Sequence, residues 1–433
     1  MQVRFCISVS FCISGSFCIF HFAFCIDLMP TRYGEPPWLH EFPRTRRPDF
    51  PRLRGEHSCG VVIVGGGLTG CVTAYACAMA GLKPIVIEAD RMGQGSAGRS
   101  AGLLLADPGP LFRDVVQAHG VRSARRVFEA WARGASEGAA LLKRLKVPGG
   151  VSAISEVIAG FRGDEKALAR EHAARDEAGI ASRWLTDRQA RAATNLDAVA
   201  ALRVPYGFAV DPYRACVAVA TAASRRGAAF YEKSAARKVK FGRKSVEVTT
   251  TDAVVHAETI IVTTGIATTE FAPLRRHFKR RESYLVMTAA VPAPIRRQLC
   301  NADMTLRDIR TPHHRLRWTA DQRLIVSGAD QDETPARTRD AVLVQRTGQL
   351  MYELLMMYPA ISGLQPQYGW HLPYGQTADG LMYIGPHRNY PRHLFALGGG
   401  GDSISGAFVA ARILSRAVRG SVDKADEVFG WTR

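Results

Sequence analysis

The chain has 433 residues, of which 47% are hydrophobic and 22% charged, which excludes general disorder and is typical of one large globular domain or two interleaved ones. The formal net charge of +18 raises nucleic acid or an anionic surface as a partner. The arginines are spread along the chain, however, and no compact basic block alternates with aromatic residues, so we expect no nucleic-acid binding and instead an attraction for anionic ligands.

Residues 1–28 differ from the rest of the sequence because they contain a repeated Phe-Cys-Ile motif, which begins at residues 5, 11, 17 and 24. A single arginine precedes these repeats, serines interrupt the apolar residues, and no small-residue cleavage site follows them. We interpret the segment as a start-site artefact and expect the functional chain to begin near Met29; a weak targeting segment for export or anchoring is the alternative. No later run is long enough to span a bilayer, so we expect a cytoplasmic body without stable membrane insertion.

Residues 29–57 are rich in proline and arginine, which predicts an extended arm over the surface. Regular structure is predicted to begin after this arm. Residues 59–64 (CGVVIV) form a short apolar run typical of a buried parallel strand, residues 68–80 are helical and end at Gly81, and residues 84–88 (PIVIE) predict a second strand. The three segments form a strand-helix-strand unit.

The turn between the first strand and its helix carries the pattern GxGxxG at Gly65, Gly67 and Gly70. These glycines allow a tight turn, the approach of a pyrophosphate to the backbone, and close packing of helix and strand. Glu88 ends the second strand, where a carboxylate can accept hydrogen bonds from both ribose hydroxyls. The pattern therefore predicts an adenine-dinucleotide site, rather than a tight turn alone.

A second loop rich in glycine and small residues, residues 89–104, distinguishes FAD from NAD as the dinucleotide. An NAD-dependent dehydrogenase needs no such loop here, whereas a flavin extends beyond the pyrophosphate and needs further contacts. Ser96, Arg99, Ser100 and Gly102 are the candidates for these contacts.

The rest of the chain predicts a helical insertion, a helix with a small meander, a second insertion rich in strands, and a last strand-helix unit. The predicted helices are residues 211–226 and 340–357. The predicted strands are residues 229–232, 237–241, 245–250, 254–258, 260–264, 283–289, 315–320 and 323–328. Four glycines, residues 398–401, join an apolar strand to the apolar terminal helix, so we interpret them as a close approach to a ligand and not as a linker.

These motifs together resemble the FAD-dependent D-amino-acid oxidase/glycine oxidase (DAO) family. The resemblance is carried by GGGLTG with Glu88, GRSAGL, the DPYR helix, IIVTTG at Gly265, RWTADQRLIVSGAD, TADGLMYIGP and the glycine run before the terminal helix. It extends from about residue 60 to the end of the chain.

The resemblance implies an α/β flavoprotein, in which a Rossmann-like FAD-binding domain carries an inserted antiparallel β-sheet substrate domain. We assign residues 58–147, 206–275 and 375–433 to the FAD-binding domain and residues 148–205 and 276–374 to the substrate domain. FAD is expected to be noncovalent, because GRSAG contains no histidine and no cysteine lies near Gly398.

Matching positions also imply which residues contact FAD, from the pyrophosphate and ribose through the adenine to the flavin ring. The candidates are Gly65, Gly67, Leu68, Thr69, Gly70, Glu88, Ala89, Ser96, Arg99, Ser100, Ala101, Gly102, Ala236, Gly265, Gly399, Gly400, Gly401, Asp402, Ser403 and Ile404. No metal site is expected.

Family chemistry implies that a C–N bond of a small amine or N-substituted amino acid is oxidised by hydride transfer to flavin N5. Water then hydrolyses the imine, and oxygen or another acceptor takes the electrons. In amino-acid-oxidising members an arginine before the Asp-Gly pair grips the substrate carboxylate, but Tyr374 stands there in this sequence. Arg315 and Arg317, which alternate along one strand, are the candidates to replace it, and His371 is a candidate acid or base.

A second departure lies in the glycine loop, where Asp402 and Ser403 replace the Asn-Gly of relatives. Asp402 either caps the terminal helix or opposes negative charge on the reduced flavin. These departures keep two alternatives open. One is a flavin-binding accessory or non-catalytic DAO-like protein, and the less favoured one is an NAD(P)-dependent dehydrogenase.

Overall fold

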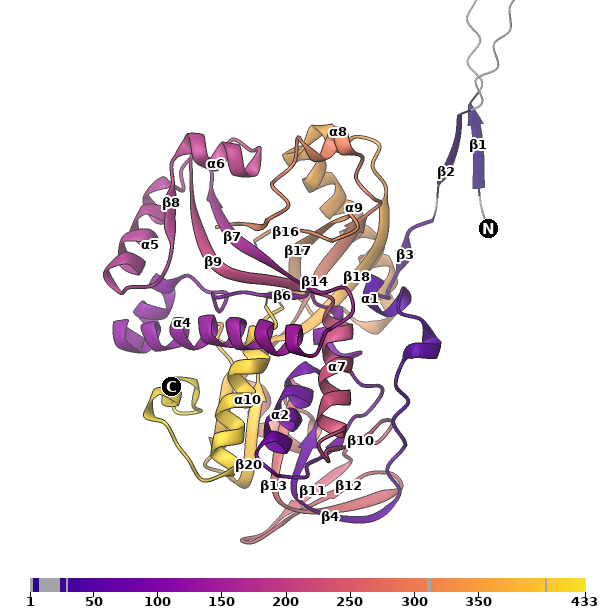
Figure 1. The fold of residues 1–433 in the computed structure, drawn as a ribbon, viewed down its shortest axis with the longest axis vertical. Coiled ribbons are helices and arrows are strands. Elements are labelled where there is room, and N and C mark those ends of the chain that lie inside the picture. The colour runs from indigo at the N-terminus through magenta and orange to yellow at the C-terminus, as the bar shows by residue number, and fades with distance from the viewer. Residues whose placement is uncertain (1–2, 8–23, 29, 310–312, 402) are drawn as a thin grey trace, which may run out of the picture.

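The computed structural model describes residues 3–7, 24–28, 30–309, 313–401 and 403–433. Two large sheets dominate it, one with eight strands and one with ten. Figure 1 shows the ten-stranded sheet above, the eight-stranded sheet below, and helix α4 (Phe112–Arg144) crossing between them. Most of residues 1–28 and Asp402 lie outside the described residues, although β1 (Val3–Ile7) and β2 (Phe24–Leu28) pair in a small sheet of their own. Among the described helices none is long and apolar enough to cross a membrane.

The eight-stranded sheet has a parallel centre that the apolar runs of the sequence predict. Neighbouring parallel strands are β10 (Ala229–Tyr231), β5 (Ile85–Ile87), β4 (Gly55–Val64), β13 (Ala253–Gly265) and β20 (Tyr390–Leu397). Antiparallel strands complete it: β12 (Val246–Thr249), β11 (Lys238–Phe241) and β19 (Tyr383–His387). Residues 254–258 and 260–264, predicted as two strands, form the single strand β13.

Helices α2 (Leu68–Met79), α7 (Pro212–Ser224) and α10 (Ser405–Val418) pack side by side on one face of this sheet. Strand side chains alternate between two cores, so that Val61 and Ile63 face these helices while Val62 and Val64 face the other side. The second core is closed by the meander and the 3-10 segment Thr269–His277.

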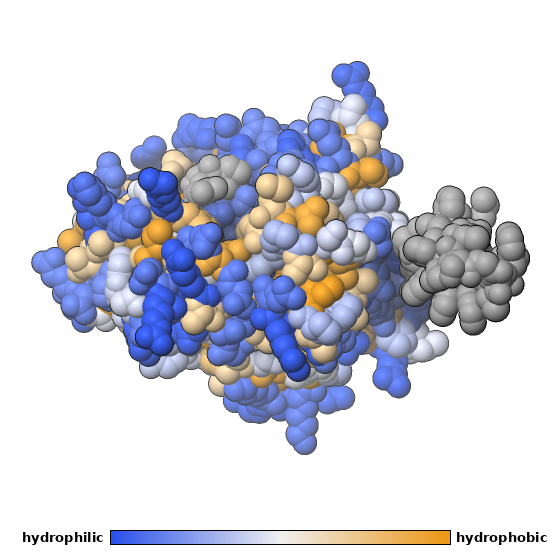
Figure 2. All heavy atoms as spheres, turned by 90° about the horizontal axis from the view of Figure 1, so that it is seen from above, coloured by the Kyte–Doolittle hydropathy of each residue, from blue (hydrophilic) through white to orange (hydrophobic). Residues whose placement is uncertain are grey.

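The ten-stranded sheet collects segments that lie far apart in the sequence. Its order is β3 (Arg32–Tyr33), β18 (Pro366–Gln376), β14 (Lys279–Thr288), β17 (Leu324–Asp332), β16 (Arg315–Trp318), β15 (Met304–Asp308), β7 (Val151–Gly160), β9 (Ala200–Val210) and β6 (Leu103–Leu104), and β8 (Arg183–Leu185) pairs with β9. The pairing of β15 with β7 joins the two inserted segments into one sheet. Helices α5 (Glu165–Glu177), α6 (Asp187–Thr194) and α9 (Arg339–Met357) surround it, and α9 packs on β14, β17 and β18. Figure 2 shows this end of the molecule, where hydrophilic side chains surround small hydrophobic areas.

Helix α4 begins at a buried cluster of charges. The Glu171 carboxylate accepts hydrogen bonds from the backbone N–H groups of Phe112 (2.8 Å) and Arg113 (3.1 Å). Arg175 holds Glu171 (Nε to Oε1, 2.7 Å) and pairs with Asp107 (2.6 Å). The negative charge thus lies at the helix N-terminus, where the helix dipole favours it.

The segment before β4 is not the extended surface arm that its composition predicts. It contains the short helix α1 (Pro37–His40) and a 3-10 turn, Arg44–Arg46, and Trp38, Leu39 and Phe42 are buried. Composition misses this because a few apolar side chains and one charge cluster dock a segment that is otherwise rich in proline and arginine.

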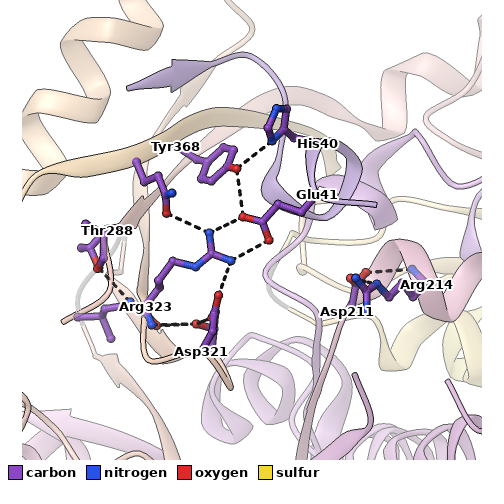
Figure 3. A network of polar contacts seen from close by, with 12 residues as sticks. His40, Glu41, Asp211, Arg214, Thr288, Asp321, Arg323 and Tyr368 are labelled. Carbon is purple, nitrogen blue, oxygen red and sulfur yellow. Dashed lines mark hydrogen bonds and ion pairs between the residues drawn. The ribbon is translucent and has the colours of Figure 1, made fainter. Parts of the chain in front are cut away.

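A charge cluster fastens the same segment to the ten-stranded sheet (Figure 3). Arg323 donates to both carboxylate oxygens of Glu41 (2.5 and 2.8 Å) and pairs with Asp321 (2.6 Å). The Tyr368 hydroxyl donates to Glu41 Oε1 (3.1 Å) and lies 3.0 Å from His40 Nδ1. Bidentate arginine-carboxylate pairs of this kind fix orientation as well as contributing energy.

Candidate functional site

Three adjoining cavities form a trough between the two sheets. The inner cavity (about 390 Å³) and the middle cavity (about 100 Å³) share Leu68, Thr69, Ser96, Ala97 and Gly265 as lining residues. The middle cavity and the outer cavity (about 280 Å³) share a second set: Tyr374, Gly375, Met382, Gly399, Gly400, Gly401, Ser403 and Gly406. The shared walls make one elongated site that runs from β4 to the ten-stranded sheet.

The inner cavity lies at the carboxyl ends of β4, β5 and β13. A Cβ on Gly70 would stand 1.9 Å from the carbonyl oxygen of Gly65, so helix α2 can lie this close to the turn only with glycine there. Gly65 has a φ of +112°, which favours glycine. No side chain caps α2 at Gly67, so the N–H groups of its first turn remain available to an anion in the cavity.

Glu88 lines the same cavity with an oriented carboxylate. Its Oε2 accepts a hydrogen bond from Gly66 N (2.6 Å), and its Oε1 accepts one from Asp90 N (2.9 Å). Each carboxylate oxygen has further acceptor capacity, so the group can still accept from two hydroxyls of a ribose. Ala89 and Ala236 line the cavity beside it.

In the second loop, residues 89–104, some of the residues predicted to contact FAD line the trough and others pack against the rest of the protein. Ser96 lines the inner and middle cavities and donates to the Pro373 carbonyl (3.1 Å), and Ser100 lines the middle cavity. Arg99, Ala101 and Gly102 line none of the three cavities. Arg99 instead donates to the Gly34 carbonyl (3.0 Å), Ala101 is buried in a hydrophobic core, and Gly102 takes a φ of +70°.

The glycine loop forms the wall between the middle and outer cavities. Gly399, Gly400, Gly401, Ser403 and Ile404 line the middle cavity, whereas the prediction for Asp402 falls outside the described residues. Ser403 Oγ accepts hydrogen bonds from Leu105 N (3.1 Å) and Ser405 N (3.2 Å), just where α10 begins. Gly406 and Ala407 in the first turn of α10 line the middle cavity, so the positive end of the helix dipole faces the trough.

The outer cavity opens below the inward face of the ten-stranded sheet. The Tyr374 hydroxyl donates to Asp330 Oδ2 (2.6 Å), and both residues line the cavity. Burial and the Asp330 carboxylate raise the pKa of Tyr374, so its proton is retained at neutral pH. Arg281 lies directly opposite Tyr374 in the β14–β18 register and pairs with Asp332 (2.7 Å).

The other predicted substrate residues lie away from these cavities. His371 and Tyr374 are three positions apart on β18, so their side chains lie on opposite faces of the sheet. The Nδ1 atom of His371 is buried without a hydrogen-bond partner in the described structure. Arg315 pairs with Glu156 (2.8 Å). Arg317 donates to the Val210 carbonyl (3.2 Å), lies over the Trp38 ring, and lines a separate cavity beside Arg323. Neither arginine replaces the missing arginine at Tyr374 in the outer cavity.

Sequence reasoning missed Arg281, Arg307 and Asp330, which all line the outer cavity. For Arg307 the sequence does contain a signal, because apolar Met304 and Leu306 alternate with Thr305 and Arg307. The structure buries Met304 and Leu306 in one core. Arg307 must therefore face the other side of the sheet. The sequence does not reveal the order of the strands in the sheet, and this order places the face that carries Arg307 over the trough.

The trough has the features that FAD requires, since it is elongated, begins at a glycine turn with a free helix N-terminus, and carries an acid for the ribose. The family model described as DAO, FAD dependent oxidoreductase, matches residues 60–417. The chain belongs to this family. FAD is accordingly its cofactor, and the two-sheet architecture is that of DAO-type flavoproteins.

The individual proteins that this chain resembles are distant in sequence. Gamma-glutamylputrescine oxidoreductase of Escherichia coli is 23% identical over 386 residues, 87% of either chain. A Bacillus subtilis protein, YhfW, is 31% identical over only 86 residues, which span 20% of this chain and 17% of that protein. The crystal structure of glycine oxidase from Geobacillus kaustophilus superposes with a TM-score of 0.71 at 20% identity, over 87% of this chain and 99% of that one.

Proposed function

We propose that this protein oxidises a C–N bond of a small amine or N-substituted amino acid with FAD. The proposal rests on the place where the middle and outer cavities meet. The backbone of residues 399–401 lines both cavities there, and the outer cavity is also lined by the charged side chains of Arg281, Arg307 and Asp330. The names of two relatives, gamma-glutamylputrescine oxidoreductase and glycine oxidase, support the substrate class.

The inner cavity would hold the adenosine and pyrophosphate, with Glu88 at the ribose and the α2 N-terminus at the phosphates. The middle cavity would hold the flavin ring beside the glycine loop. We propose that attachment is noncovalent, because neither the Ser96–Arg99 segment nor residues 398–401 contain a histidine or cysteine. We assign the FAD-binding and substrate domains as predicted from the sequence. When bound, FAD supplies the acceptor for the hydride and passes electrons to oxygen or another acceptor.

The chain's own groups would orient the substrate in the outer cavity. Tyr374 keeps its proton and directs it at Asp330, so the Asp330 carboxylate is held in place as an acceptor for an amine N–H. The α10 dipole and the backbone of residues 399–401 favour negative charge in the middle cavity. Both effects work by position and electrostatics.

Product analysis tests this proposal. Purified protein should carry FAD that denaturation releases, and incubation with a panel of amines, amino acids and sarcosine-like compounds should yield the carbonyl compound and the released amine from at least one of them. A protein that binds FAD but forms no such product from any panel member would instead support the non-catalytic alternative, which the tyrosine at position 374 favours.

A further inference from the structure

Arg307 is a buried cation that faces the outer cavity with unused hydrogen-bond donors. It lies on β15, is 4% exposed, and lines the cavity beside Gly109, whose carbonyl accepts from its Nη1 (2.5 Å). Its Nη2 and Nε have no hydrogen-bond partner within the described part of the chain. A buried guanidinium with idle donors is costly unless something pairs with it.

The nearest carboxylate compensates Arg307 only in part. Glu156 Oε1 lies 3.4 Å from Arg307 Nε, but the same oxygen is 2.8 Å from Arg315 Nη1. Burial alone raises the pKa of Glu156, yet Arg307 and Arg315 together hold it below its usual value, so the group is ionised. The same Glu156 oxygen therefore interacts with two guanidinium groups, and Arg307 lies farther from it than Arg315 does.

The opposite end of the outer cavity has a different character. Asp330 lies on β17 and Tyr374 on β18, and only β16 lies between β15 and β17 in the sheet. Two strand spacings correspond to about 10 Å between β15, which carries Arg307, and β17. The cavity thus offers an anion-binding group at one end and an acceptor for an amine at the other.

We propose that Arg307 binds the carboxylate of the substrate, so that the substrate class is an amine that carries a carboxylate away from the oxidised C–N bond. This inference rests on the proposed function, because the outer cavity is the substrate site only if the trough holds FAD. It makes Arg307 the residue that compensates for the loss of arginine at position 374.

Binding of simple carboxylates to the FAD-loaded protein tests the inference without turnover. Acetate, butyrate and hexanoate are titrated against their amides, and binding is followed by the flavin visible spectrum and by the unfolding temperature. At least one carboxylate should bind saturably and at least about tenfold more tightly than its amide, because a charged hydrogen bond is replaced by a neutral one. Absence of saturable binding by every carboxylate, or equal binding of the amides, would overturn it.

Three variants sharpen the test. Arg307→Gln should remove the preference for carboxylate over amide, and Arg307→Lys should keep part of it. Arg317→Gln is the matched control, a buried arginine on the same sheet face that lines a different cavity, and it should keep the full preference. FAD content and circular dichroism verify folding, and a folded Arg307→Gln protein with unchanged preference contradicts the inference.

The two proposals fail separately. If carboxylates bind through Arg307 but no amine yields an oxidised product, the proposed function is wrong and the anion site stands. If amines are oxidised while carboxylates do not bind, the function stands and the assignment of Arg307 is wrong.

Discussion

Gly70 lies where even one added carbon would collide with the Gly65 carbonyl. Gly70→Ala should therefore displace the N-terminus of α2 from the inner cavity and weaken FAD binding at least about tenfold, since a carbon at 1.9 Å cannot be accommodated without movement. FAD titration followed by fluorescence quenching measures the change. Gly348→Ala, in α9 where a Cβ meets nothing within 4 Å, is the control and should keep FAD affinity while stabilising the fold by about 0.5–1 kcal/mol. Equal FAD affinity in both variants would refute the placement of the pyrophosphate.

Asp211 gives a pH dependence whose sign is unusual for a carboxylate. It caps α7 by accepting from Arg214 N (2.9 Å), but burial, which outweighs the Arg214 contacts, raises its pKa from 3.8 to about 6. The folded protein thus holds a proton that the unfolded chain releases above pH 4. Stability contributed by this group is fully present below that pH and is lost as pH rises to about 6.

Asp211→Asn keeps the capping oxygen and removes this titration. Relative to wild type, its free energy of unfolding should rise by on the order of 2–3 kcal/mol between pH 4 and pH 7.5, the value of a two-unit pKa shift. Urea unfolding at the two pH values measures it. A difference that stays constant with pH, or changes in the opposite direction, would show that Asp211 is ionised in the folded protein at pH 5.

At the scale of elements, the Arg323–Glu41 cluster should decide whether residues 30–54 stay docked. Arg323→Ala removes a bidentate pair and leaves Tyr368 and Glu41 without their cation, so we expect the segment to open at a cost of about 1–3 kcal/mol. Native-state trypsin digestion should then cut at Arg44, Arg46 or Arg47 faster than in wild type. Arg280→Ala, which breaks an exposed pair with Glu333, is the control and should leave cleavage unchanged. Equal rates for both variants would mean that the apolar side chains alone hold the segment.

The same scale shows why sequence patterns succeed in some segments and fail in others. The unit from β4 through α2 to β5 is predicted well because apolar runs, a glycine turn and Gly81 all agree locally. The segment of residues 30–54 is predicted poorly. Its composition resembles a linker, while it contacts α3 (Ser96–Arg99), α7, α9 and β18, and all of these except α3 follow more than 150 residues later. The sequence predicts two strands on either side of Thr259, because residues 254–258 alternate in polarity and residues 260–264 form an apolar run, although the backbone of β13 continues through both.

At the scale of the whole molecule, the cofactor side of the trough follows from local motifs, whereas the substrate side does not. Glu88, Ser96, Gly265 and residues 399–401, which the sequence proposes as FAD contacts, all line the cavities, since each directly follows a strand or loop whose place the motif fixes. The outer cavity depends on which strands are neighbours in the ten-stranded sheet. That order brings Arg307 over the trough and Arg317 over a different cavity, and alternation within one strand cannot distinguish the two.

Under the proposed function, FAD in this trough accepts a hydride from the carbon bound to an amine nitrogen. Anaerobic mixing of the FAD-loaded protein with a panel of amines, carboxylated amines and sarcosine-like compounds tests it most directly. We predict that at least one compound bleaches the visible flavin absorbance, and that deuterium on the carbon bound to nitrogen slows the bleaching. A flavin that dithionite reduces but that no panel member bleaches would contradict the claim.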